Sequence, residues 1–226
     1  MEVPTSLVGL LNGLEGVAEF VEEGSTLPDF DLHCPLLSLP LAFKTSIDNI
    51  PSAHAYLRTN ADKVSGWLSK LGTKTKPRVG LVWGGSTGHK NDSNRSIALS
   101  LLLSYLPTTF DYVCLQKELR EVDRATLQAQ TIIRYFGEEL VDFTDTAALC
   151  ELMDVVVSVD TSVAHLAGAL GKKTWILLPY VPDWRWMLER TDSVWYQSVK
   201  LYRQDTAGNW GGVLTQVRDD LSKLVA

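Results

Sequence analysis

The sequence predicts an α/β fold in which helices cover both faces of a parallel sheet. Six short apolar runs follow one another after residue 77, helical stretches separate them, and polar residues gather directly after the runs. Runs that are apolar on both faces are typical of strands in a parallel sheet. Strands that alternate with helices are connected by right-handed crossovers, which gives a doubly wound, Rossmann-like domain.

The individual elements follow from the hydrophobic pattern, taken along the chain. Strands are expected at residues 78–83, 112–115, 140–143, 154–159, 174–178 and 199–202. Helices are expected at 97–106, 121–136, 145–153, 162–170 and 183–190, with an amphipathic helix near 210–224. Each strand is thus followed by a helix, as the crossovers of a doubly wound sheet require.

The residues before the sheet give a sparser pattern. The polar stretch 72–77, rich in Lys and Thr, is interpreted as a linker. Upstream of it the sequence predicts a helix at 6–14, a strand at 17–21, a Pro-punctuated run at 34–41 and a helix at 62–71. These few elements cannot enclose a core of their own. We therefore expect three parts: a remnant of a larger domain at 1–71, a Rossmann-like domain at 77–205 and a C-terminal helix at 206–226.

Composition disfavours several classes of function. The chain has 226 residues, of which 45% are hydrophobic and 21% charged, as in an ordinary globular protein. With 21 basic and 27 acidic residues its net charge is −6, which disfavours nonspecific binding to nucleic acid or anionic membranes. No apolar run approaches the roughly 20 residues that span a bilayer, and no signal peptide is visible. The sequence predicts a soluble, cytoplasmic protein.

The cysteines and histidines give no sign of a metal or disulfide framework. Cys34, Cys114 and Cys150 lie far apart, each beside apolar residues, which suits buried thiols in a reducing compartment. No Cys/His spacing is typical of zinc, so no metal or other cofactor is expected. The G-x-S-x-G motif of serine hydrolases is also absent.

Polar residues that follow the strands are expected to meet on one rim of the sheet. Ligands of open α/β sheets bind outside the carboxyl ends of the strands. The loops concerned are 84–95, 116–118, 144–146, 160–165 and 179–186. They are far apart in sequence, and the sheet gathers them in space.

The loop after the fourth strand is the most informative. Asp160 or Thr161 can cap the next helix and leave backbone N–H groups of its first turn free to bind a phosphate. Ser162 adds a hydroxyl, and His165 lies within one turn. The alternative is an ordinary cap with a packed or surface histidine, but a place opposite a second glycine-rich loop favours the phosphate site.

That second loop follows the first strand. Gly84 and Gly85 allow close backbone approach, and Lys90 or Arg95 can neutralise a phosphate, arginine with two hydrogen bonds. The loop matches neither a Walker A motif nor G-x-G-x-x-G, so a nicotinamide dehydrogenase is disfavoured. The alternative is a solvated basic loop.

Two further loops supply candidate ligands. Glu118 can accept hydrogen bonds from ribose hydroxyls, and Gln116 and Lys117 are equally well placed. Trp184 and Arg185 belong to an aromatic cluster that can cover a sugar or a base, although aromatic side chains more often complete a core.

Several longer stretches share the pattern of a known family. They are 27–40, 80–84, 89–97, 158–171, 178–186 and 192–196. Together they resemble the glycosyltransferase half of bacterial tetratricopeptide-repeat proteins, which is related to the heptosyltransferases of glycosyltransferase family 9. The most specific match is the segment in which Asp160, Thr161 and Ser162 are followed by His165.

The resemblance implies a GT-B architecture, in which two Rossmann-like domains face each other across a cleft. Residues 77–205 would then bind a nucleotide-sugar donor, and residues 1–71 would belong to the acceptor-side domain. Asp160, Thr161, Ser162 and His165 would hold the diphosphate. Lys90 or Arg95 would stabilise the leaving phosphate, and Glu118 would hold the ribose. The family's general base lies early in the N-terminal domain and has no counterpart here, so catalysis is expected of a longer protein.

We therefore predict a metal-independent, inverting glycosyltransferase of which this chain is mainly the donor-binding half. The sequence does not identify the acceptor, for which a protein and a glycan both stay open. Two alternatives stay open: a non-catalytic module that binds a nucleotide or another phosphorylated ligand, and a structural interaction domain. Sheet edge and apolar surface around residues 17–21 and 35–41 predict a homodimer that pairs these segments.

Overall fold

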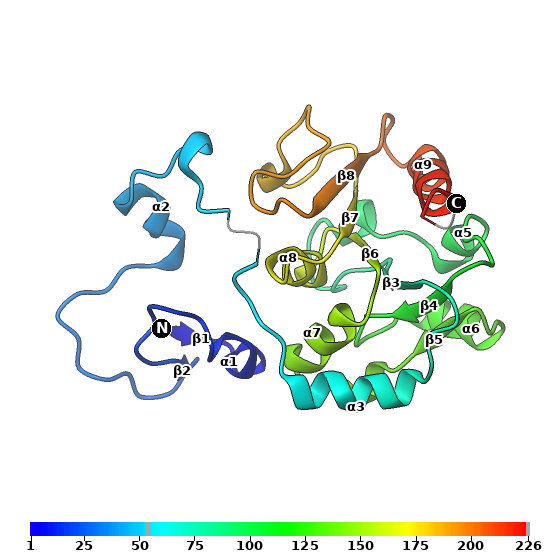
Figure 1. The fold of residues 1–226 in the computed structure, drawn as a ribbon. Helices are drawn as coiled ribbons and strands as arrows, with labels where there is room; N and C mark the ends of the chain where they lie inside the picture. The colour runs from blue at the N-terminus through cyan, green and yellow to red at the C-terminus, as the bar shows by residue number, and fades with distance from the viewer. Residues whose placement is uncertain (53–54, 225–226) are drawn as a thin grey trace.

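The computed structural model describes residues 1–52 and 55–224. Its centre is a six-stranded parallel sheet with the strand order β5-β4-β3-β6-β7-β8 (Figure 1). The strands are β3 (Arg78–Val82), β4 (Asp111–Cys114), β5 (Ile133–Tyr135), β6 (Val155–Val159), β7 (Thr174–Leu178) and β8 (Val199–Arg203). The α/β class and the parallel sheet that the sequence predicts are confirmed.

The order of the strands fixes where a ligand can enter. From β3 the chain winds outward through β4 to β5, returns to β6 beside β3, and then winds the other way through β7 to β8. Val79 pairs with Val155, and Val82 with Ser158. The connections that leave β3 and β6 therefore part in opposite directions. Such a switch point leaves a crevice at the carboxyl ends of the two strands.

Helices cover both faces of the sheet. Figure 1 shows α7 and α8 on one side and α5, α6 and α9 on the other. Their bounds, with the short α4, are α4 (Asp92–Arg95), α5 (Leu99–Leu103), α6 (Glu121–Gln128), α7 (Phe143–Glu151), α8 (Ser162–Ala169) and α9 (Trp210–Ser222). Along β7 the side chains alternate between two apolar clusters, Trp175 and Leu177 in one and Ile176 and Leu178 in the other. A strand that is buried on both faces needs such a continuous apolar run.

The third strand was predicted in the wrong place. The predicted helix 121–136 ends at Gln128, and its last residues form β5 instead. Gln130 stops the helix because its side-chain oxygen accepts hydrogen bonds from the amides of Ile132 and Ile133. Of the predicted strand 140–143, residues 140–142 form a loop and Phe143 begins α7. In this loop Val141 is 75% exposed, and Asp142 caps α7 by accepting from the amide of Thr144.

The predicted helix 183–190 is only a single 3₁₀ turn, η4 (Trp184–Trp186). Met187 has a φ of 54°, a left-handed conformation that ends the turn. Arg203 of β8 then donates to the carbonyl oxygens of Trp186, Met187 and Arg190. These bonds replace the helical hydrogen bonds that the segment lacks.

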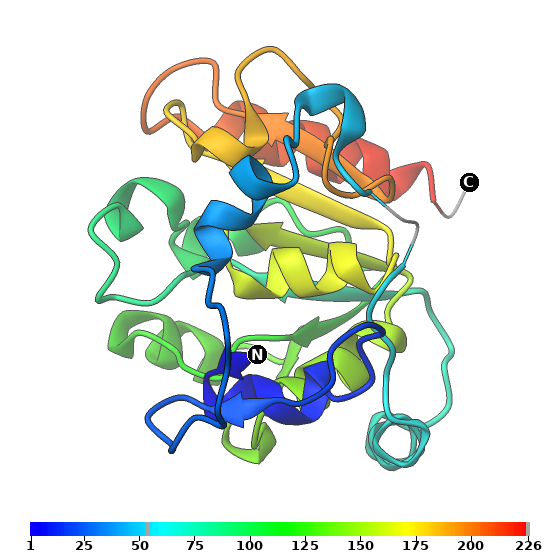
Figure 2. The same ribbon diagram turned by 90° about the vertical axis from the view of Figure 1, so that its left-hand side faces the viewer.

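The N-terminal region forms short elements that lie on the α7 and α8 side of the molecule (Figure 2). They are β1 (Glu2–Val3), α1 (Thr5–Leu11), β2 (Val21–Glu22), η1 (Leu36–Ser38), α2 (Leu39–Ala42), η2 (Ile47–Asn49) and α3 (Ala61–Leu71). The predicted strand 17–21 is reduced to β2, which pairs with β1 over two residues. None of the helices among the described residues is long and apolar enough to cross a membrane.

The cysteines follow the prediction only in part. Cys114 and Cys150 are fully buried, and burial raises the pKa of each thiol to about 12. Cys34 was predicted to be buried and is exposed, as are all residues from 31 to 38.

Two of the contacts between the upstream chain and the α/β part involve α3 and the segment around Tyr56. In α3, Lys63 Nζ lies 2.9 Å from Asp145 Oδ2 of α7, and Trp67 Nε1 donates to Asp145 Oδ1 at 3.2 Å. Further along, the amides of Tyr56 and Leu57 donate to the carbonyl oxygen of Ala169, at 3.0 and 3.2 Å. The second contact fixes this segment at the end of α8.

Candidate functional site

The loops that follow β3, β4, β6 and β7 meet at the carboxyl edge of the sheet, and two of the cavities that they line share the start of α8. The β4-side cavity has a volume of about 260 Å³ and lies between the β3 and β4 loops and the start of α7. The β7-side cavity, of about 710 Å³, lies between the β3, β6 and β7 loops. Thr161 and Ser162, where α8 begins, line both cavities. The two cavities therefore meet at the N-terminus of α8, beside the switch point.

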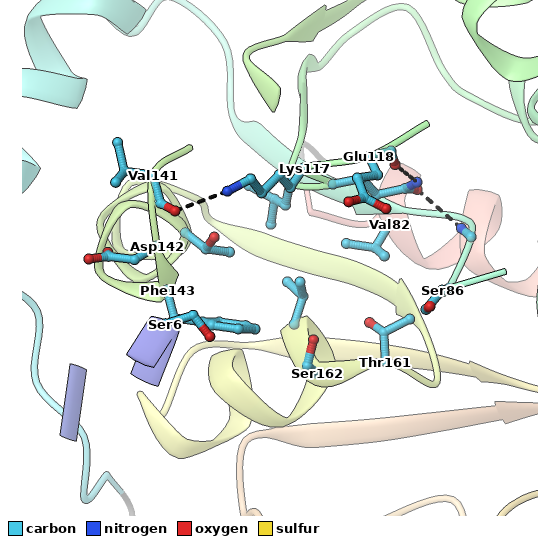
Figure 3. A pocket seen from close by; sticks show the side chains of 16 residues that line it. Ser6, Val82, Ser86, Lys117, Glu118, Val141, Asp142, Phe143, Thr161 and Ser162 are labelled. Carbon is cyan, nitrogen blue, oxygen red and sulfur yellow. Dashed lines mark hydrogen bonds between the residues drawn. The ribbon is translucent and has the colours of Figure 1, made fainter. Parts of the chain in front are cut away.

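The β4-side cavity has apolar walls and a polar rim (Figure 3). Its walls include Val82, Leu115, Val141, Phe143 and Val163. Its polar lining is Ser6, Gly84, Gly85, Ser86, Gln116, Lys117, Glu118, Asp142, Thr146, Thr161 and Ser162. An apolar slot with a few polar groups at its mouth is typical of a small-molecule site.

The side chain of Gln116 holds two loops of this cavity together. Its Oε1 accepts hydrogen bonds from the amides of Trp83, at 2.7 Å, and Gly84, at 3.1 Å, and its Nε2 donates to the carbonyl of Glu118. The buried amide thus ties the β3 loop to the β4 loop. Lys117 donates to the carbonyl of Val141 at 3.0 Å, whereas the carboxylate of Glu118 is exposed at the rim.

A buried carboxylate, which the sequence analysis missed, joins the β3 loop to its neighbours. Asp92 pairs with Arg95, whose Nε lies 3.3 Å away, and with Arg120, and it accepts from Ser96 Oγ at 3.0 Å. Arg95 also donates to the carbonyl of Asp160 at 2.7 Å. The i, i+3 spacing of Asp92 and Arg95 was a usable signal. Nothing local to the sequence points to Arg120.

Gly85 is required by the same cluster. A Cβ atom at this position would lie 2.7 Å from Asp92 Oδ1 and would collide with the guanidinium of Arg95. Its amide donates to Ser96 Oγ at 3.1 Å. Because glycine has no Cβ atom, the backbone of the β3 loop can approach the Asp92–Arg95 pair closely.

The start of α8 has the form expected of an anion site, with one correction. Thr161 is the N-cap, yet neither it nor Asp160 caps the helix through its side chain, because the Thr161 hydroxyl lies 3.1 Å from Ser158 Oγ instead. Among the residues that the structure describes, the amides of Ser162 and Val163 have no acceptor. Ser162 is exposed and Thr161 is half-buried. The positive end of the helix dipole thus faces the junction of the two cavities.

His165 is held one turn into α8. Its Nδ1 lies 3.0 Å from the Tyr196 hydroxyl, its ring stacks on Trp186 with centroids 5.0 Å apart, and its Nε2 lies 3.9 Å from Asp160 Oδ1. Burial lowers the pKa of His165, which outweighs the attraction of Asp160. The imidazole is therefore neutral at pH 7 and lines the β7-side cavity.

The structure brings most of the predicted site residues together. The β4-side cavity contains Gly84, Gly85, Gln116, Lys117 and Glu118, and the β7-side cavity contains Arg95, Asp160, His165 and Arg185. Lys90 and Trp184 line neither cavity. Trp184 is 66% exposed and packs against Arg185 and Trp195. Within residues 1–52 and 55–224 there is no cluster of three His, Cys, Asp or Glu side chains that suits a metal ion.

Comparisons with known proteins place the fold. No protein-family model matches the chain. Over 205 residues the chain is 26% identical to the protein FlbA of Caulobacter vibrioides. This alignment covers 84% of this chain and 33% of FlbA. The chain therefore spans about a third of the length of this curated relative.

Two solved structures are similar in fold. The ADP-heptose lipopolysaccharide heptosyltransferase II of E. coli superposes with a TM-score of 0.54 at 16% identity, over 79% of this chain and 56% of that one. The glycosyltransferase family 9 protein of Veillonella parvula DSM 2008 gives 0.50 at 12% identity, over 76% and 53%. The chain thus has the α/β fold of GT-B-like glycosyltransferase structures, with their parallel sheet. The association with tetratricopeptide repeats stays a prediction.

Proposed function

We propose that this chain binds the nucleotide-sugar donor of a metal-independent, inverting glycosyltransferase. The observation that carries the proposal is the junction of two cavities at the free N-terminus of α8. A nucleotide sugar consists of a base with its ribose, a diphosphate that carries two negative charges, and a sugar. The β4-side cavity offers apolar surface to the base, the start of α8 offers donors to the diphosphate, and the wider β7-side cavity offers polar groups to the sugar.

The base and ribose fit the β4-side cavity. Val82, Leu115 and Phe143 offer apolar surface to a flat base. The exposed carboxylate of Glu118 stands at the rim, where it can accept hydrogen bonds from ribose hydroxyls. Gln116 and Lys117 act mainly by shaping this rim, since their polar groups already bind the backbone.

The diphosphate belongs over the start of α8. The amides of Ser162 and Val163 and the hydroxyls of Thr161 and Ser162 face it with donors, and the helix dipole adds positive potential. Arg95 is fixed by Asp92 and by the carbonyl of Asp160, so its charge lies in a set position beside the phosphates. Lys90 is exposed and has no acceptor in the described part of the chain.

The sugar then occupies the β7-side cavity, which Asp160, His165 and Arg185 line. In the full-length enzyme a base on the acceptor side removes the proton of the acceptor hydroxyl, whose oxygen attacks the anomeric carbon. The bond to the diphosphate breaks on the opposite side, so the configuration inverts. The α8 terminus, with Lys90 or Arg95, stabilises the negative charge that develops on the departing diphosphate.

Calorimetry with UDP, GDP and ADP tests the binding part of this proposal. We expect one nucleotide to bind, and we expect Thr161→Ala and His165→Ala to weaken that binding about tenfold or more. Ser100→Ala is the matched control, because Ser100 is exposed on α5, outside both cavities. Binding of no nucleotide contradicts the proposal and favours a structural domain.

Turnover separates a transferase from a binding module. The full-length protein is assayed for consumption of the nucleotide sugar whose nucleotide binds. Consumption with transfer supports the glycosyltransferase. Tight binding without any transfer favours the non-catalytic module.

A further inference from the structure

The imidazole of His165 is restrained on its face and at one edge by groups that are distant in sequence. Trp186 stacks on its face, with 20° between the ring planes. At its edge, Nδ1 lies 3.0 Å from the hydroxyl of Tyr196, a side chain that is itself only 9% exposed. The ring of His165 is therefore fixed in orientation before any ligand arrives.

The position of Tyr196 depends on a glycine in α8. A Cβ atom added to Gly168 would lie 2.6 Å from Cγ of Tyr196 and 2.9 Å from both Cδ atoms. Gly168 lies inside a regular helix, where φ is negative and any residue is allowed, so conformation does not demand a glycine here. Space demands it, because the tyrosine ring rests directly on the helix backbone.

The Tyr196 hydroxyl keeps its proton under all ordinary conditions. Burial raises the pKa of Tyr196 strongly, and the neighbouring Tyr56 raises it further. A hydroxyl that keeps its proton can donate it to Nδ1 of a neutral imidazole. In that arrangement the proton of the ring lies on Nε2, whereas the reverse arrangement, in which Nδ1–H donates to the Tyr196 oxygen, would leave Nε2 without a proton.

The charged groups around His165 favour the same tautomer. Asp160 Oδ1 lies 3.9 Å from Nε2, too far for a hydrogen bond but close enough to favour a proton on that nitrogen. Asp183 adds to the negative potential, and Arg185 opposes it. Burial disfavours a second proton on the ring. The neutral Nε2–H tautomer suits donation from Tyr196 and the potential of the two carboxylates.

We propose that Tyr196 is a positioning residue: it holds His165 as the Nε2–H tautomer, so that Nε2 presents a neutral donor to an oxygen of the bound donor substrate in the β7-side cavity. The identity of that oxygen, in the diphosphate or the sugar, rests on the proposed function. The tautomer itself does not, because every contact that fixes it lies within the chain.

Nitrogen-15 NMR of the histidine side chains tests the assignment in the free protein. The His165 signals are identified by their loss in His165→Ala. In the wild type we expect a protonated Nε2 and an unprotonated Nδ1 that accepts a hydrogen bond. Tyr196→Phe keeps a ring of the same shape on Gly168 and removes only the hydroxyl, so we expect the Nδ1 signal to shift and the two tautomers to mix.

Two further variants make the test specific. Gly168→Ala keeps the tyrosine and its hydroxyl but displaces the ring that carries it, and it should produce the same change of tautomer as Tyr196→Phe. Tyr105→Phe, at the end of α5 and outside both cavities, should leave the His165 signals unchanged. A His165 tautomer that stays the same in Tyr196→Phe overturns the inference, whatever the protein binds.

Calorimetry then connects the tautomer to the ligand. We expect Tyr196→Phe to raise the Kd for the nucleotide diphosphate that the wild type binds by about threefold to tenfold, the value of one hydrogen bond. An unchanged Kd alongside a changed tautomer overturns the ligand-facing role of Nε2. If the wild type binds none of UDP, GDP and ADP, the proposed function fails, and the NMR result still decides the role of Tyr196.

Discussion

Residues 78–224 and residues 1–52 contain similar apolar side chains and use them very differently. In the first region every residue of β3, β6 and β7 is buried, and helices close both faces of the sheet. In the second, Leu32, Leu37 and Leu41 are 89%, 85% and 84% exposed. Apolar composition thus makes a core only where strands and helices form layers that cover one another. The candidate site lies entirely at the edge of the layered region, apart from Ser6 at its rim.

Matched leucine truncations test this contrast most directly. Leu149→Ala, in α7 with no exposed surface, should lower the free energy of unfolding by about 2–5 kcal/mol, because it removes buried contacts and leaves a cavity. Leu37→Ala should change it by less than about 0.5 kcal/mol. Urea unfolding measures both. Equal effects of the two substitutions would show that residues 1–52 are packed in solution.

The next prediction concerns two cations of the same loop in the layered region. Lys90→Ala or Arg95→Ala should lower the turnover of the full-length protein about 10- to 100-fold and affect donor affinity less, because the charge that they stabilise develops in the transition state. Steady-state kinetics with calorimetry separates the two effects. Unchanged turnover in both single variants would refute this role.

These two variants should also differ in stability. Arg95 is bound to Asp92 and to the carbonyl of Asp160, so its loss should destabilise the loop, whereas Lys90 should be replaceable without cost. Thermal unfolding checks this difference. Equal melting temperatures for the two variants would contradict the fixed position of Arg95.

A third prediction tests the contact of α3 with the layered region. Burial would raise the pKa of Asp145, but hydrogen bonds from Lys63, Trp67 and the amide of Val141 outweigh it and hold the pKa below its usual range. Asp145→Asn should therefore lower the free energy of unfolding by about 1–2 kcal/mol at pH 7. Asp31→Asn, in an exposed loop, is the control.

The pH dependence of this effect has a definite sign. A carboxylate whose pKa is lower in the folded state stabilises the fold above its unfolded pKa of about 4, and the contribution is lost as the pH falls through the folded value. The wild type and Asp145→Asn should converge in stability below pH 4. A difference that persists at pH 2 would contradict the ionic part of the contact.

The smallest effect is expected for the self-association of the chain through residues 1–52. We propose that the exposed apolar side chains around residues 35–41 support a weak homodimer. Light scattering should show an average mass that rises with concentration, and Leu37→Asp with Leu41→Asp should abolish the rise without changing stability. A monomer at high concentration would count against the dimer.

The sequence pattern was sufficient to predict those strands and loops whose structure depends on neighbouring residues in the chain. The runs that became β3, β6 and β7 are long, apolar and bounded by polar residues, and the glycine-rich and Asp-Thr-Ser loops after β3 and β6 lie on the predicted rim. β5 was not predicted, because it has only three residues, Ile133–Tyr135, with an arginine at its centre. The more apolar stretch around Leu140 owes its burial to packing and not to a strand.

The roles of site residues depended on partners that no local pattern reveals. Arg95 is separated by 65 positions from Asp160, whose carbonyl it binds, and the Gln116 amide clamps a loop 32 or 33 positions away. Both residues were predicted as candidate ligand contacts, and the structure shows both of them hydrogen-bonded to protein. Tyr196 lies in a stretch that resembles the family, but its contacts with His165 and Gly168 could not be read from the sequence.

The segment around Tyr56 joins the upstream chain to the surroundings of Tyr196. Its backbone is fastened to the last turn of α8, and Gln197, next to Tyr196, donates to the carbonyl of Ser52 at 3.1 Å. The upstream chain is therefore hydrogen-bonded at two places close to the tyrosine that contacts His165. Residues far upstream of the sheet thus take part in the packing around the imidazole, although none of them follows a strand of the parallel sheet.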